Sequence, residues 1–172
     1  VRALRDKVGW HRVRFEPPLL TMEPGMEIDL GGIGKEYAVD RAGMSAQALH
    51  PHCLINFGGD LLAIGPRADG RPWRVGIERV DGRDTCDVPL DLTVGALATS
   101  GDSRRYLLKR GIRYGHVLDP RTGWPVRDAP RSVTVAALTC TQAGMLATFA
   151  LLHGSEAESF LLAQHVGHWC RR

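Results

Sequence analysis

The chain has 172 residues, of which 44% are hydrophobic and 24% charged, and its formal net charge is +3 at pH 7. This length and composition are typical of one globular domain with a substantial core. The 22 basic residues are spread among 19 acidic ones without a basic run, which excludes a typical nucleic-acid-binding surface. No stretch reaches the roughly 18 apolar residues of a membrane span, so no membrane-spanning segment is predicted.

The four cysteines (Cys53, Cys86, Cys140 and Cys170) are far apart and form no CxxC pair. We therefore expect small buried apolar residues rather than a disulfide framework. Residues 50–53 read His-Pro-His-Cys, which superficially suggests a metal cluster. Their spacing fits no standard zinc pattern, so a loop is predicted there.

The N-terminal part of the chain predicts short elements separated by turns. A helix is expected over residues 1–9 and strands over 10–15, 19–22 and 26–30, with a turn at 23–25. Residues 31–34 form a glycine-rich loop, and residues 35–49 have helical periodicity. The entry of a loop into a helix leaves backbone N–H groups without partners, which favours an anion site there.

The remainder predicts many strands in hairpin-like succession and two more helices. Strands are expected over residues 53–57, 61–64, 73–78, 88–94, 95–99, 113–118 and 133–137, with a turn at 67–71; residues 104–109 stay unassigned. Helices are expected over 141–152 and 155–165, the second with Ser155 as N-cap and Glu158 in the capping box. Together with the helix at 35–49, this predicts a single α+β domain with a mainly antiparallel sheet.

Residues 29–35 read Asp-Leu-Gly-Gly-Ile-Gly-Lys. A nucleotide P-loop is excluded, because Asp29 stands at the position of its first glycine and Glu36 at that of its Ser or Thr. A Rossmann fingerprint is also excluded, since its third glycine is missing. Two interpretations stay open: a plain strand–turn–helix connection, or a loop whose glycines approach a diphosphate while Lys35 supplies a cation.

Two further motifs have glycines beside an acidic residue. In residues 56–60 (Asn-Phe-Gly-Gly-Asp), the glycines predict a bulge or tight bend, or a backbone lying against a flat ring with Asp60 as an acceptor. Residues 99–102 (Thr-Ser-Gly-Asp) predict either a turn with an Asx cap or one wall of a ligand pocket.

Residues 116–123 read His-Val-Leu-Asp-Pro-Arg-Thr-Gly. His116 has either a structural role or that of a general base, since a neutral imidazole has suitable basicity near pH 7. Arg121 is expected to pair with Asp119, the alternative being a contact with phosphate.

Taken together and in this order, over residues 19–162, the motifs resemble the ApbE family of flavin transferases. These enzymes cleave FAD and attach its FMN half to a threonine or serine of a target protein. The resemblance implies the family's layered α+β fold, and a single domain over residues 1–172 without the N-terminal portion of full-length members. It also implies FAD contacts by Asp29 and Lys35, a pocket wall with Asp60 and Ser100, and a backbone contact from Leu118.

The resemblance further implies a magnesium site. Family members carry Ala-Asp-x-x-x-Thr in the last buried helix, where the Asp and the Thr bind the metal together with a glycine carbonyl. These roles fall on Thr148 and Gly32. Gly144 stands in place of the Asp, although a hard cation normally requires an anionic oxygen. Candidates to replace that carboxylate are Asp29, Asp102 and the FAD diphosphate.

The resemblance thus predicts transfer of FMN from FAD to a Thr or Ser hydroxyl of an acceptor flavoprotein, with release of AMP. His116 is the expected base, FAD the substrate and Mg²⁺ the cofactor. The alternative is a catalytically impaired flavin-binding or scaffold protein of the same fold. Family members are often periplasmic and membrane-anchored, but this chain shows no signal peptide or lipidation site, so the compartment stays open.

Overall fold

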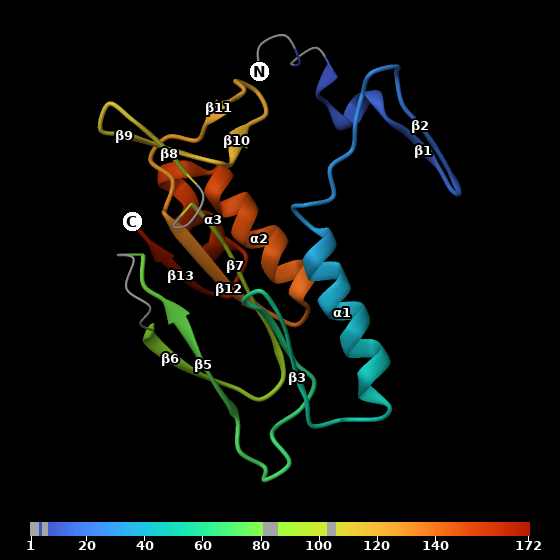
Figure 1. Ribbon diagram of the computed structural model, residues 1–172, viewed down its shortest axis with the longest axis vertical. Helices are drawn as coiled ribbons and strands as arrows, with labels where there is room; N and C mark the ends of the chain where they lie inside the picture. Colours follow the sequence, from blue (N-terminus) through green and yellow to red (C-terminus); the bar gives the residue numbers. More distant parts are fainter. Residues whose placement is uncertain (1–3, 5–6, 81–85, 103–105) are drawn as a thin grey trace.

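The computed structural model describes residues 4, 7–80, 86–102 and 106–172. Its centre is a five-stranded antiparallel sheet in the order β13-β12-β7-β4-β3 (Figure 1). The strands are β3 (Leu54–Phe57), β4 (Asp60–Ala63), β7 (Gly95–Gly101), β12 (Ser132–Ala137) and β13 (Gly167–Arg171).

The described residues also form four antiparallel two-stranded units. They are β1 (Arg14–Glu16) with β2 (Leu19–Thr21), β5 (Trp73–Glu78) with β6 (Cys86–Leu92), β8 (Tyr106–Lys109) with β9 (Ile112–Gly115), and β10 (Leu118–Asp119) with β11 (Trp124–Pro125). The α-helices are α1 (Gly34–Gln47), α2 (Cys140–Leu152) and α3 (Ala157–Ala163), with short 3₁₀ turns η2 (Trp10–Arg12) and η3 (Gly154–Glu156). The predicted α+β class with three α-helices and mainly antiparallel sheets is confirmed.

The two faces of the sheet differ because side chains alternate along a strand. Ala98 of β7 and Val133 and Val135 of β12 are fully buried in one core with α2, which contributes small residues such as Ala143 and Ala147. Alanines let the helix backbone approach the sheet closely. Burying each of these valines contributes roughly 1.5–3 kcal/mol to stability.

Helices α1 and α2 lie side by side (Figure 1) and are joined by one carboxylate. Asp40 of α1 accepts hydrogen bonds from the backbone N–H groups of Cys140 and Thr141, at 2.7 and 2.9 Å. These are first-turn donors of α2 that have no partner within their own helix. Asp40 therefore fixes the register of α1 against α2, on which the geometry of the site described below depends.

We expect Asp40→Ala to lower the free energy of unfolding by about 1–3 kcal/mol, because it removes two charge-assisted hydrogen bonds at a helix N-terminus. Urea unfolding followed by circular dichroism measures this, with the exposed Asp91→Ala as the matched control. Equal loss of stability in both variants would contradict the role of Asp40.

Near the N-terminus the predicted strands are partly wrong. Residues 26–30 form no strand, and Trp10–Arg12 is a 3₁₀ turn. Strand β2 pairs instead with the preceding β1 across Pro17-Pro18, so the two prolines make the hairpin turn. The expected helix over residues 1–9 falls largely outside the described residues.

Other parts of the prediction also differ from the structure. The strand expected over 113–118 is interrupted at His116, where the chain bends between β9 and β10. Ser155 is not an N-cap, because it lies inside the turn η3 and α3 begins after Glu156 without a side-chain cap. Strand β13, which completes the sheet edge, is absent from the sequence prediction.

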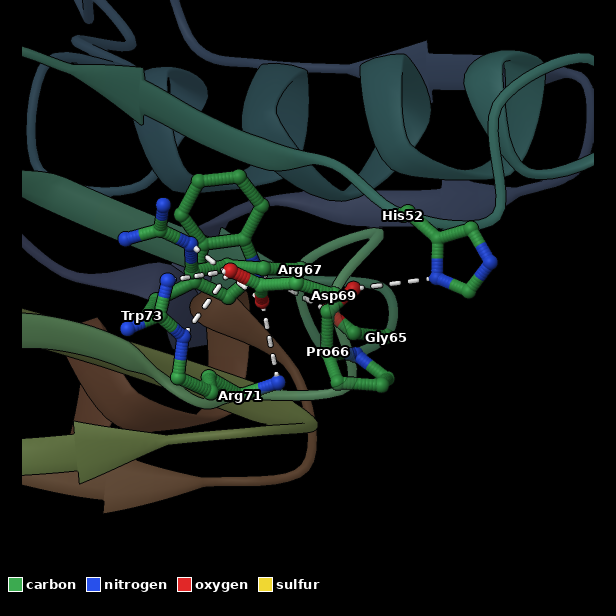
Figure 2. A network of polar contacts seen from close by, with 7 residues as sticks. All are labelled: His52, Gly65, Pro66, Arg67, Asp69, Arg71 and Trp73. Atoms are coloured by element: carbon green, nitrogen blue, oxygen red, sulfur yellow. Dashed lines mark hydrogen bonds and ion pairs between the residues drawn. The ribbon is translucent and has the colours of Figure 1, made fainter.

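Residues 50–53 form a loop, as predicted. Figure 2 shows the His52 ring against the carbonyl of Pro66, where Nδ1 lies 3.0 Å from the oxygen. In the adjoining turn, the guanidinium of Arg71 hydrogen-bonds to Asp69, and the indole N–H of Trp73 donates to the Gly65 carbonyl. His52 thus contributes to a structural loop.

Cys53, Cys140 and Cys170 are free thiols, and the side chain of Cys86 lies outside the described part. Burial raises the pKa of Cys140 to about 12, as expected for a small core residue. Of the helices in the described part of the chain, none combines the length and apolar character that a membrane crossing requires.

Candidate functional site

A cleft of about 890 Å³ lies beside the central sheet, between the start of α1, the β3–β4 hairpin and strand β5. Polar residues of β7 and β12 line it, including Thr99 and Thr134, whose hydroxyls lie 2.8 Å apart. Six of the residues predicted for the site line this one cleft: Gly32, Lys35, Asp60, Ser100, His116 and Thr148. Tertiary structure therefore brings five separate sequence motifs together.

The glycine loop before α1 forms one wall. Asp29 accepts a hydrogen bond from the backbone N–H of Gly31 at 2.7 Å and so shapes the turn. Helix α1 then begins at Gly34, and no side chain caps its N-terminus. Its first-turn N–H groups therefore suit an anionic ligand. Asp29 itself is exposed and does not line the cleft.

Asp60 and Lys35 form an ion pair in the cleft. Asp60 is 1% exposed, and its Oδ2 lies 2.6 Å from Nζ of Lys35, whose side chain is 44% exposed. Gly58 and Gly59 both have positive φ, 62° and 100°, so they form the tight bend predicted between β3 and β4. This bend places Asp60 at the start of β4, facing Lys35.

Two hydroxyls meet deeper in the cleft. Oγ of Ser100 lies 2.8 Å from Oγ1 of Thr148, which joins β7 to α2. Ser100 therefore belongs to the cleft wall rather than to an isolated turn, which favours the second of the two interpretations of residues 99–102. Thr148 stands one helical turn after Gly144 on the same side of α2.

His116 lies exposed at the bend between β9 and β10 and faces the cleft. The following turn is held by the expected pair, in which the Arg121 guanidinium donates to Asp119 at 2.9 and 3.0 Å. This hydrogen bonding lowers the pKa of Asp119. Leu118 is 43% exposed and does not line the cleft, so its predicted contact with FAD stays a prediction.

Glu36 is a site residue that sequence reasoning missed. It is 7% exposed and lines the cleft, and its Oε2 is buried without a hydrogen-bond partner. Burial, reinforced by the charge of neighbouring Asp60, raises the pKa of Glu36. Its only sequence signal is its position directly after Lys35, where a P-loop would have Ser or Thr.

The side chain of Glu36 lies over Gly144. A Cβ atom added at position 144 would lie 2.6 Å from Cγ and 3.0 Å from Oε1 of Glu36. Glycine at this position therefore leaves the space that Glu36 fills. A carboxylate from α1 therefore lies beside position 144 of α2.

Asp102, one of the candidates to replace that carboxylate, lies elsewhere. Its Oδ2 accepts from Nε of Arg113 at 3.0 Å, and it lines a separate cleft of about 650 Å³ beside β9 and β11. Among the described residues, no three His, Cys, Asp or Glu side chains form a ready metal centre. The main cleft thus offers two buried carboxylates, Glu36 and Asp60, together with hydroxyl and backbone oxygens.

Comparison with known proteins agrees with this arrangement of motifs. The ApbE family matches residues 1–169, almost the whole chain. The chain belongs to the ApbE family. It is 37% identical to the FAD:protein FMN transferase of Vibrio cholerae over 163 residues, which cover 91% of this chain and 48% of that protein. With the corresponding Haemophilus influenzae protein it shares 31% identity over 88% of this chain and 44% of the relative.

Solved structures show the same fold. The ApbE protein of Thermotoga maritima superimposes with a TM-score of 0.85 at 32% identity, covering 97% of this chain and 56% of that one. The flavin transferase ApbE of Vibrio cholerae gives a TM-score of 0.83 at 31% identity, covering 97% and 54%. The predicted layered ApbE fold is confirmed, and the chain spans about half the length of the curated relatives it matches.

Proposed function

We propose that this chain binds FAD and transfers its FMN moiety to a Thr or Ser hydroxyl of an acceptor flavoprotein, with release of AMP. The observation that carries this proposal is the convergence of Lys35, Asp60, Ser100 and His116 on one cleft. The cleft also falls in the size range of small-molecule sites. The names of the relatives, which are FAD:protein FMN transferases, support the same reaction.

The proposed roles follow from position and charge. The N-terminus of α1 and the ammonium of Lys35 stabilise the diphosphate of FAD. His116 accepts the proton of the acceptor hydroxyl as its oxygen attacks the FMN-side phosphorus. The bond from that phosphorus to the bridging oxygen then breaks, and AMP leaves with the bridging oxygen. Reactions of this class depend mainly on positioning and charge neutralisation.

The residues present also fit Mg²⁺, which prefers oxygen ligands and keeps several waters. The cleft offers the unpartnered Oε2 of Glu36, the hydroxyl of Thr148 and the backbone at Gly32. When bound, the ion would neutralise negative charge developing on the phosphate oxygens. We favour an active transferase over the impaired binding protein, because a buried carboxylate occupies the space beside Gly144.

The first test is nucleotide selectivity. Because the glycine loop, Lys35 and the Asp60 hairpin are assigned jointly to a flavin nucleotide, the chain is expected to bind FAD more tightly than NAD or ATP. Fluorescence titration with the three nucleotides measures this. Equal, weak binding of all three would contradict the proposal.

A second measurement addresses the reaction. The chain is incubated with FAD, Mg²⁺ and a candidate acceptor protein, and the acceptor is analysed for covalently attached flavin by in-gel fluorescence after denaturation. AMP, measured by chromatography, is expected to appear in equal amount to the attached FMN. Binding of FAD without covalent flavin on any acceptor would support the impaired binding protein instead.

A further inference from the structure

The position of Glu36 bears on metal binding in the cleft. An inference from this position rests on the proposed function and makes that function more specific. Glu36 is more than nine-tenths buried, and its Oε2 has no hydrogen-bond partner although it lines the cleft. An unpaired buried carboxylate oxygen costs free energy, so such an atom normally has a partner that is an ion, a donor or an ordered water.

The groups around Glu36 suit a cation. Asp60 is the neighbouring carboxyl, and Lys35 is its ion-pair partner at 2.6 Å. These three groups carry a net charge of −1 when both acids are ionised, and the cleft is also lined by Arg74, Glu78 and Arg79, whose side chains add one further positive charge in sum. The paired hydroxyls of Ser100 and Thr148 line the same cleft and supply neutral oxygens. The two neighbouring carboxylates and the neutral oxygens therefore suit a hard divalent cation by ligand type.

The register of the helices explains why Glu36 lies over α2 one turn before Thr148. On α1, Glu36 and Asp40 are four residues apart and share a face. On α2, Gly144 lies between Cys140, which Asp40 caps, and Thr148 at the cleft. With Asp40 fixed at one end, Glu36 lies over Gly144, one turn before Thr148.

We propose that Glu36, projecting from α1 over Gly144, is the carboxylate ligand of a divalent cation that Thr148 of α2 also binds. Because Gly144 has no side chain, it leaves room for the side chain of Glu36. The ligand set is thus split between two helices, with α1 providing the charge and α2 the hydroxyl.

The direct test is metal binding without flavin. Mg²⁺ is titrated against the chain at constant ionic strength, with melting temperature as readout, and Mn²⁺ binding is followed by electron paramagnetic resonance. We compare the parent with Glu36→Gln, which keeps the shape but removes the charge, and with the exposed control Glu156→Gln.

The parent and Glu156→Gln are expected to bind Mn²⁺ saturably, and Mg²⁺ is expected to raise their melting temperatures. In Glu36→Gln the affinity is expected to fall at least tenfold and the thermal shift to disappear. Parental affinity in Glu36→Gln would overturn the proposal, as would absence of saturable metal binding in the parent both with and without FAD.

A charge-relocation variant covers the case in which Glu36→Gln alters the fold. Gly144→Asp alone is expected to lower the melting temperature, because its Cβ meets Cγ of Glu36 at 2.6 Å and a third carboxylate joins two buried ones. Glu36→Gly combined with Gly144→Asp removes the overlap and returns one carboxylate to the site. This double variant is expected to bind Mn²⁺ at least tenfold more tightly than Glu36→Gly alone.

If the double variant and Glu36→Gly bind Mn²⁺ with equal affinity, the proposal that positions 36 and 144 face the same metal site is overturned. FAD titration of every variant without metal separates this inference from the proposed function. A parent that binds FAD but whose metal affinity is unaffected by Glu36→Gln contradicts the inference alone. A parent that binds metal through Glu36 but shows no preference for FAD contradicts the proposed function alone.

Discussion

Replacing His116 with alanine is expected to slow FMN transfer by about 10²–10⁴-fold, the range for loss of a positioned general base. FAD affinity should change little, because His116 lies at an exposed bend and the groups assigned to the diphosphate lie on α1 and the β3–β4 hairpin. The fold should also be retained, since His116 is outside the buried core.

Single-turnover transfer to the acceptor and FAD titration are measured side by side for His116→Ala. The matched control is His50→Ala, an exposed histidine that does not line the cleft. A selective loss of the transfer rate identifies His116 as the base. Parental transfer by His116→Ala would instead assign the residue a structural role, whereas a parallel loss of FAD affinity would make it a binding residue.

Several strands, inside and outside the central sheet, could be predicted from sequence because they have strong local signals. Residues 73–78 alternate in burial and form β5 with the predicted bounds, and residues 133–137 lie within β12. The sequence does not predict strand β13, because this strand depends on its pairing with β12. That pairing is a tertiary contact for which the five residues of β13 carry no local signal. Residues 26–30 have strand-like residues but pair with no strand among the described residues, and they are irregular.

The residues that line the main cleft could be predicted in part, because several of them belong to recognisable motifs. Residue type and spacing leave both a ligand contact and a plain turn open for Lys35 beside glycines and for Asp60 after Gly59, and it is the resemblance to the ApbE family that favours ligand contacts. The role of Glu36 was not predictable, because it depends on helix packing. The register that brings Glu36 over Gly144 is set by Asp40 and Cys140, 100 positions apart in sequence.

Lys35 shows how the structure changes an expected result. From sequence, Lys35→Ala should weaken flavin binding by roughly 1–3 kcal/mol while the fold survives, as for an exposed loop residue. In the structure, Lys35 belongs to α1 and neutralises Asp60, which is 1% exposed. Removing one partner of a buried charge leaves the other uncompensated.

We therefore expect Lys35→Ala to lower the free energy of unfolding by about 1–3 kcal/mol, less than for a fully buried pair because water reaches the half-exposed lysine. FAD affinity should fall by a similar free energy, since the cation for the diphosphate is also lost. Denaturant unfolding and FAD titration measure the two effects separately, with the exposed Lys109→Ala as control.

The double variant Lys35→Ala with Asp60→Asn separates the two roles of the lysine. It removes the uncompensated carboxylate and is expected to regain most of the lost stability, because a neutral amide costs less to bury than an unpaired charge. FAD affinity should stay low, since no cation returns to the cleft. If the double variant is no more stable than Lys35→Ala, the ion pair contributes nothing to folding. If instead Lys35→Ala binds FAD as the parent does, the lysine serves Asp60 alone, and the diphosphate must be held by the backbone of the glycine loop.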